Sequence, residues 1–255
     1  MGAFIVDARI NSGAADPAIL SLVFREGSRP DGDAVNLAGQ GDGPAGSFTV
    51  SHRPDPSEGW LELLSNGLTF DCLGIAPGTP AAVPPPGALL GLGAIPEGEA
   101  VALRPGPHIA AGRGLLPVVR VLAAVGLRLA GLPGVRAVCW QPAGSWMEAG
   151  YYRRVVGDWL EGGAFPALGL TSLRRESNGA MVSLGLGLLI GQELRFEPDR
   201  NLSAGAVARI SVRLIHELIT GGPLSEPKEF TGADGEVLLA VPVRGGEQLR
   251  VMVGK

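Results

Sequence analysis

Apolar residues alternate with small or charged residues along the segment from Met181 to Glu197, which reads MVSLGLGLLIGQELRFE. The even positions are nearly all apolar: Val182, Leu184, Leu186, Leu188, Ile190, Leu194 and Phe196. Side chains of a β-strand point alternately to its two faces, so a period of two predicts a strand with one buried face. Such a strand would be far longer than ordinary strands, and we therefore expect a kink or tight turn near Gly191.

The other face of this predicted strand begins with glycine and ends with charge. This face includes Ser183, Gly185, Gly187, Gly191, Glu193, Arg195 and Glu197. Glycine on a strand face marks a bend or a place where another backbone or a ligand approaches closely. A packed helix is the ordinary cause, and a small molecule bound under a neighbouring loop is the alternative. We therefore take Gly185 and Gly187 as candidate binding residues.

Charged residues beside these glycines allow two interpretations. Glu193 and Arg195 at the rim of a bare sheet face can contact a ligand, but charges also protect an edge strand from aggregation. His216 lies next to Glu217 on a predicted helix, and acid–base catalysis needs a proton carrier beside a carboxylate. A solvated helix face explains the same two residues. We add Glu193, Arg195 and His216 to the candidate binding residues and predict no catalytic residue.

The first part of the chain, residues 1–107, is predicted to be rich in β-structure. Asn66-Gly67 lies between two apolar runs and predicts a hairpin, since a type I′ turn needs positive φ at both central positions. Residues 27–46 are predicted to be a polar loop, and residues 74–107 to be a Pro- and Gly-rich loop that lies across a sheet or links two parts. The predicted strands are Phe4–Ile10, Ile19–Arg25, Phe48–His52 and the two arms of the hairpin.

The second part, residues 108–255, mixes helices and strands. Helices are predicted near 115–130, 148–160 and 204–220, the last with Ser203 as its cap and Gly221-Gly222 as its exit. Further strands are predicted at 135–140 and around a hairpin at Gly245-Gly246. We therefore predict an α+β fold in which mainly antiparallel strands are covered by about three helices. Ferredoxin-like elements are possible in this second part, which we expect to pack as one compact unit with the first.

Composition excludes several classes of protein. The net charge is −4 and the basic residues form no cluster, so we expect neither nucleic acid nor a membrane surface as a partner. The three histidines and two cysteines show no ligand spacing, which predicts no metal. Phosphate-binding and nucleophile motifs are missing, and we expect no cofactor. Cys72 and Cys139 lie in apolar stretches and are expected to be buried thiols of a cytoplasmic protein.

The order of segments in the second part resembles the bacterial domain-of-unknown-function family 4261. In that family a His before an apolar helix precedes a strand ending in Trp, and a later Gly-rich strand continues into a Gly-x-x-Glu-Leu-like segment. The matching positions here are His108, Trp140, Gly185, Gly191 and Glu193 with Leu194. The resemblance implies an α+β fold, and it implies no assigned activity.

The sequence predicts a non-catalytic interaction or accessory protein of the bacterial cytoplasm, with another protein as its partner. An apolar composition without a convergent cluster of titratable residues is typical of a surface that binds. The alternatives are an acid–base enzyme or a small-molecule binder whose site lies around Glu193 and the Gly185/Gly187 strand face. Whether Glu193, Arg195 and His216 meet in one cleft distinguishes these hypotheses.

Overall fold

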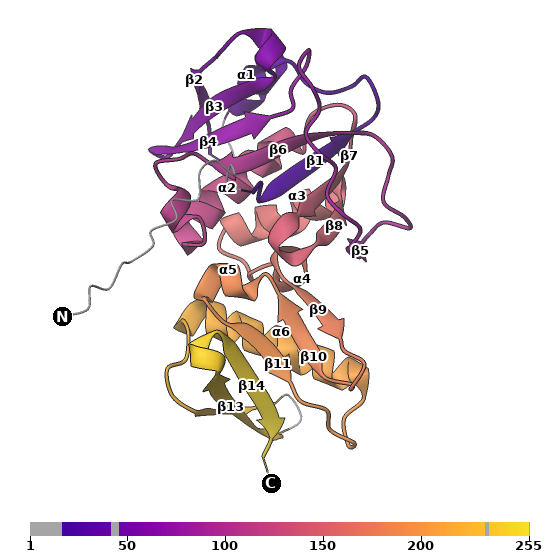
Figure 1. Ribbon diagram of the computed structural model, residues 1–255, viewed down its shortest axis with the longest axis vertical. Coiled ribbons are helices and arrows are strands. Elements are labelled where there is room, and N and C mark those ends of the chain that lie inside the picture. The colour runs from indigo at the N-terminus through magenta and orange to yellow at the C-terminus, as the bar shows by residue number, and fades with distance from the viewer. Residues whose placement is uncertain (1–16, 42–45, 233–234, 255) are drawn as a thin grey trace, which may run out of the picture.

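The computed structural model describes residues 17–41, 46–232 and 235–254. Its strands form two mainly antiparallel sheets, which lie one below the other along the long axis of the molecule (Figure 1). Three long helices cover them, so the predicted α+β class is confirmed. The predicted strand Phe4–Ile10 lies outside the described residues.

The first sheet has eight strands in the order β2-β3-β4-β6-β1-β7-β8-β5. All neighbours are antiparallel except β5 and β8. The strands are β1 (Leu20–Phe24), β2 (Thr49–His52), β3 (Trp60–Ser65), β4 (Leu68–Leu73), β5 (Ala88–Leu90), β6 (Glu99–Pro105), β7 (Val135–Trp140) and β8 (Ser145–Glu148). The hairpin of β3 and β4 turns at Asn66 and Gly67, whose φ angles of 49° and 75° are those of the predicted turn.

Helices cover one face of the first sheet. They are α1 (Gly32–Gly39), α2 (Leu116–Leu129) and α3 (Ala149–Leu160). The inward residues of the strands, such as Leu22, Leu63 and Leu103, are fully buried against them. The prediction of a loop over residues 27–46 is wrong at α1, because Asp31 accepts hydrogen bonds from the backbone N–H groups of Asp33 and Ala34 and so begins a helix there.

The Pro- and Gly-rich segment packs across part of the opposite face. Leu92 and Ile95 cover a small apolar cluster that includes Val23 and Trp146. The Trp146 indole N–H donates to the Pro85 carbonyl at 3.0 Å, and β5 within the segment joins the sheet beside β8. This segment is therefore a packed part of the fold and not an extended linker.

The second sheet has six strands in the order β12-β13-β14-β11-β10-β9, of which only β11 and β14 run parallel. The strands are β9 (Ser172–Arg175), β10 (Met181–Leu184), β11 (Glu193–Phe196), β12 (Lys228–Thr231), β13 (Val237–Val243) and β14 (Gln248–Val253). One long helix, α6 (Ala204–Gly221), covers one face of this sheet (Figure 1). The described residues of this part form no ferredoxin-like pair of crossover helices.

Two short helices lie between the two sheets (Figure 1). They are α4 (Ala167–Leu170) and α5 (Leu186–Ile190), and single turns of 3-10 helix occur at Pro56–Glu58, Ala110–Gly112, Gln141–Ala143 and Arg244–Gly246. One continuous hydrophobic cluster extends from Leu22 in the first sheet to Val251 in the second. β7 and β8 belong to the first sheet, so the change of sheet along the chain falls between Glu148 and Ser172, whereas the sequence placed the division after residue 107.

The prediction of one long strand over Met181–Glu197 is wrong. The segment forms β10, then α5, then β11, and the second strand returns antiparallel to the first. Gly185 and Gly191 flank α5 in the left-handed conformation, with φ of 87° and 76°. The chain therefore turns at Gly191 as expected, but it also turns at Gly185, because both glycines adopt a conformation that other residues rarely do.

The buried side chain of Gln192 connects three segments at one end of the second sheet by hydrogen bonds. Its amide N–H groups donate to the carbonyls of Leu224 and Gly246, each at 2.8 Å, and its carbonyl accepts from the Leu224 N–H at 2.8 Å. The side chain is only 4% exposed. It links the start of β11 to the loop after α6 and to the turn between β13 and β14.

We expect Gln192→Ala to lower the free energy of unfolding by about 2 to 4 kcal/mol, because it leaves buried backbone groups without partners. Gln40→Ala, which truncates an exposed glutamine, serves as the control and should change stability by less than about 0.5 kcal/mol. Urea unfolding monitored by circular dichroism measures both. Equal midpoints for the two variants would contradict the role of Gln192.

Candidate functional site

The carboxylate of Glu193 binds the beginning of α5. Its Oε1 accepts hydrogen bonds from the backbone N–H groups of Gly185 at 2.8 Å and Gly187 at 2.9 Å. The Ser183 hydroxyl donates to Oε2, and this hydroxyl accepts in turn from the Leu194 N–H at 2.8 Å. The candidate residues Gly185, Gly187 and Glu193 are therefore brought together, but as a helix cap that the chain makes with itself.

Burial raises the pKa of the Glu193 carboxyl above its ordinary value. The hydrogen bonds from Ser183 and from the backbone of Gly187 and Gly185 act in the opposite direction, and burial outweighs them. A raised pKa in a cleft is a common mark of a catalytic acid. Here the acceptor capacity of Glu193 is used by the cap, so its position indicates a structural role.

The two candidate glycines do not form an open face. A Cβ atom at Gly185 would lie 3.0 Å from Cβ of Ala143, and one at Gly187 would lie 3.1 Å from Glu193 Oε1. The close approach inferred from the sequence is real, but protein atoms occupy the space. Glu193 is not a charge on an edge strand either, because β11 lies between β10 and β14.

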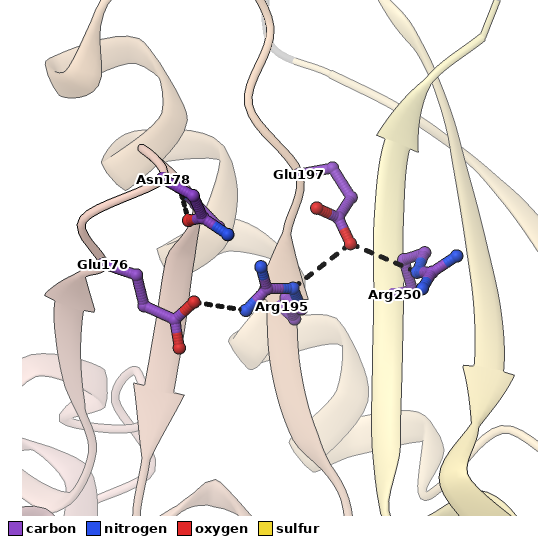
Figure 2. A network of polar contacts seen from close by, with 6 residues as sticks. Glu176, Asn178, Arg195, Glu197 and Arg250 are labelled. Carbon is purple, nitrogen blue, oxygen red and sulfur yellow. Dashed lines mark hydrogen bonds and ion pairs between the residues drawn. The ribbon is translucent and has the colours of Figure 1, made fainter.

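Arg195 is the centre of a row of charges that crosses the second sheet (Figure 2). Its Nη1 donates to Glu176 Oε2 at 2.6 Å, and its Nε donates to Glu197 Oε1 at 3.2 Å. Arg250 on β14 reaches the same Glu197 oxygen at 3.1 Å. The side chain of Arg195 is 15% exposed and that of Arg250 is 50% exposed, so the row is mostly buried at Arg195 and reaches solvent at Arg250.

His216 does not meet Glu193 or Arg195. It lies on α6, which packs on the sheet face that Leu194 and Phe196 form, whereas Arg195 points to the opposite face by strand alternation. The His216 ring packs edge-on against Phe165 at a centroid distance of 6.3 Å. Its neighbour Glu217 pairs with Arg213 at 3.3 Å. The predicted candidate residues therefore lie in three places: the cap at the start of α5, the charged row around Arg195, and His216 on α6.

The face of the second sheet opposite α6 carries an aliphatic strip beside the charged row. Leu239 pairs with Met252, and Val241 pairs with Arg250 in the register of β13 and β14. These three apolar side chains are half-buried and lie outside the main hydrophobic cluster, whereas Leu238 and Ala240, which alternate with Leu239 and Val241 along β13, belong to it. We call this surface, formed by Leu239, Val241, Met252, Arg195, Arg250, Glu176 and Glu197, the open sheet face.

A second surface lies on the first sheet, where sequence reasoning selected no residue. A hollow of about 410 Å³ opens over β3, β4 and β6, and we call it the Trp60 hollow. Its lining is Trp60, Glu62, Asp71, Leu73, Arg104, Pro107 and His108. Alternation along β3 places Trp60 and Glu62 on the face opposite the buried Leu61 and Leu63. That alternation was visible in the sequence WLELLS, but the cross-strand partners were not.

Several kinds of chemistry find no support among the described residues. No group of three or more His, Cys, Asp or Glu side chains in that part of the chain lies close enough to hold a metal ion. Burial raises the pKa of both Cys72 and Cys139 to about 12, so these thiols stay protonated at neutral pH. Among the same residues, no helix combines the length and apolarity that a membrane span requires.

Comparisons of the chain with family models, with curated proteins and with solved structures found no match. The resemblance to family 4261 therefore stays a prediction. A function can therefore be inferred only from the geometry of the open sheet face and the Trp60 hollow.

The raised pKa of Glu193 predicts how stability depends on pH. A carboxyl with a higher pKa in the folded state stabilises the fold fully below its ordinary pKa, and this contribution is lost as the pH rises through the raised value. We expect the unfolding free energy of the wild type, relative to Glu193→Gln, to decrease from about pH 4 upward until the raised pKa is passed. Urea melts of both proteins across a pH series test this. A difference that increases with pH would show that the hydrogen bonds outweigh burial.

Valine substitutions test whether protein atoms fill the space at the two glycines. Gly185→Val should destabilise by about 3 kcal/mol or more, because it combines a clash with a φ of +87° that valine does not adopt. Gly187→Val should cost about 1 to 3 kcal/mol by displacing the Glu193 carboxylate. Gly221→Val is the control, since open space surrounds that position. Midpoints of urea unfolding that are the same for all three would contradict this order.

Proposed function

We propose that the protein is a non-catalytic interaction module of the bacterial cytoplasm that binds a partner protein through the open sheet face. The observation that carries this proposal is the aliphatic strip of Leu239, Val241 and Met252, which none of the helices in the described part of the chain covers (Figure 1). The solvated face of an antiparallel sheet normally alternates to polar residues. Apolar residues bordered by charge are instead typical of protein–protein interfaces.

The charges of this face favour a protein over a nucleic acid. Arg195 and Arg250 are balanced by Glu176 and Glu197 in one connected row. Binding to a phosphate backbone needs basic groups that are not already neutralised by carboxylates. A row of alternating sign suits a protein surface with its own mixed charges, where it contributes to orientation and to the rate of association.

The face is built on rigid elements, which supports a role in recognition. β13 and β14 pair over six successive residues, and β11 joins them through a further ladder. A surface on paired strands loses little conformational entropy on binding, because its backbone is already ordered. The strip thus provides an apolar centre in a fixed geometry, with charges at its border.

The two alternative functions receive less support from the geometry. An acid–base enzyme would need Glu193 to be accessible to a substrate, whereas its carboxylate accepts hydrogen bonds from Gly185, Gly187 and Ser183. A small-molecule site at Gly185 and Gly187 would need space that Ala143 and Glu193 fill. The buried, protonated thiols of Cys72 and Cys139 are in keeping with a cytoplasmic protein.

Capture of partners by the full chain and two leucine variants tests the proposal. Leu239→Asp places a charge in the middle of the aliphatic strip, and we expect it to weaken binding of the physiological partner about 10-fold or more, as loss of a central interface residue does. Leu115→Asp changes a leucine that is 62% exposed near the start of α2, and it should leave binding unchanged. Proteins retained by the wild type and by Leu115→Asp, but lost with Leu239→Asp, are identified by mass spectrometry and re-measured in purified form.

Both variants should remain folded, because each replaces a side chain outside the core, and circular dichroism verifies this. A partner that the wild type and Leu239→Asp bind with equal affinity would contradict the open sheet face as its docking surface. Loss of binding in Leu115→Asp alone would place the interface on the first half of the molecule.

A further inference from the structure

Trp60 differs from the other tryptophans of the chain, because Trp140, Trp146 and Trp159 are all buried. Trp60 is half-buried at the start of β3, and its side chain lines three neighbouring hollows of about 410, 520 and 240 Å³. A large indole that keeps contact with solvent gives up part of its hydrophobic stabilisation. Aromatic side chains in hollows of this size are common anchors for small ligands.

Two carboxylates, Glu58 and Glu62, lie next to this indole, and neither forms an ion pair in the described parts of the chain. The imidazole of His52 lies opposite Glu62 in the register of β2 and β3 and packs on the Trp60 ring at a centroid distance of 5.4 Å, which leaves the other side of the ring for a ligand. Glu58 accepts a hydrogen bond from the Trp60 indole N–H at 3.3 Å. Glu62 accepts one from the Ser51 hydroxyl at 2.7 Å. Both donors are neutral. Other carboxylates near the hollows differ in this respect, since Asp33 pairs with Arg53 at 2.6 Å and Asp71 pairs with Arg104 at 2.9 Å.

The register of the first sheet places Glu62 directly opposite a second carboxylate, Asp71. Like charges at directly opposed positions on neighbouring strands destabilise a sheet. On its other side Asp71 lies opposite Arg104 on β6, and these two residues form an ion pair. We call the opposed carboxylates Glu62 and Asp71 the acid pair. A positive charge placed beside Glu62 would offset the repulsion between these two carboxylates.

We propose that the Trp60 hollow binds an organic cation, an alkylammonium or guanidinium group, against the indole ring and beside Glu62, with Glu58 at the N–H edge of the indole. The face of an indole ring attracts cations, and recognition of quaternary ammonium groups by aromatic side chains is a known use of this attraction. A metal ion is a poorer fit, since the described residues provide no group of three ligating side chains there. The volume of about 410 Å³ is that of a small-molecule site.

The cation has two possible sources that share this chemistry. It is either a free small amine or the Lys or Arg side chain of another protein. The hollow lies on the first sheet and the open sheet face on the second, so this site is separate from the proposed partner interface. Its test therefore does not depend on the result for Leu239.

Titration of the full chain with defined cations tests the proposal, with isothermal calorimetry and tryptophan fluorescence as readouts. The probes are choline, its uncharged isostere 3,3-dimethylbutanol, agmatine, and end-capped tripeptides centred on Lys or Arg. We expect saturable binding of cations and none of the uncharged alcohol. Binding of the peptides alone identifies a protein side chain as the source, whereas binding of choline or agmatine shows that a free cation suffices. Failure of every cation to bind up to millimolar concentrations would overturn the proposal.

Matched variants assign the binding to this hollow. Trp60→Leu should abolish it, and Trp60→Phe should retain part of it, because a smaller aromatic ring attracts cations less strongly. Glu62→Gln should weaken binding about tenfold and, by removing the acid pair, raise the urea midpoint of the unliganded protein. Glu161→Gln, which neutralises an exposed carboxylate elsewhere, should change neither property. Binding that is unaffected by both Trp60→Leu and Glu62→Gln would overturn the assignment.

Discussion

The hydrogen bonds that the Glu193 carboxylate accepts determine how the glycine-rich segment folds. They hold the backbone N–H groups of Gly185 and Gly187 at the start of α5, and so the chain leaves β10, turns, and returns as β11. β11 then lies in the middle of the second sheet and provides the parallel pairing with β14. The fold of this half depends on a charged residue that is removed from water for a structural purpose, and its raised pKa reflects that cost.

Much of the fold could be predicted from local sequence signals. The three long helices, the Asn66-Gly67 turn and the carboxyl-terminal hairpin all occur as expected, because caps, left-handed turns and alternation depend on neighbouring residues. The segment over Met181–Glu197 could not be assigned in this way. Its apolar residues fit a period of two, but a short helix between two strands also buries Leu186, and a carboxylate eight residues from Gly185 decides between them.

The candidate site was predictable only in part, because it too depends on contacts between residues that are not neighbours in the sequence. The sequence grouped Glu193 with Gly185 and Gly187 on one face of a single strand, whereas the structure brings them together by a turn in which the carboxylate binds the helix start. The Trp60 hollow was missed because its character arises from cross-strand pairs. Glu62 and Asp71 are nine residues apart in sequence, and only the register of β3 and β4 shows that they are opposed. Titratable residues that converge through register carry no signature in a single sequence.

The two surfaces have a common physical origin in the way the helices are distributed. Helices cover one face of each sheet, and on the other face packing restricts the choice of residues less. The uncovered face of the first sheet carries the acid pair of Glu62 and Asp71 beside the half-buried Trp60. The uncovered face of the second sheet carries aliphatic residues bordered by charges of both signs. Both arrangements lower stability or solubility compared with an ordinary polar surface. Binding of a cation to one face and of a protein to the other would offset these two costs independently, because the surfaces share no residue.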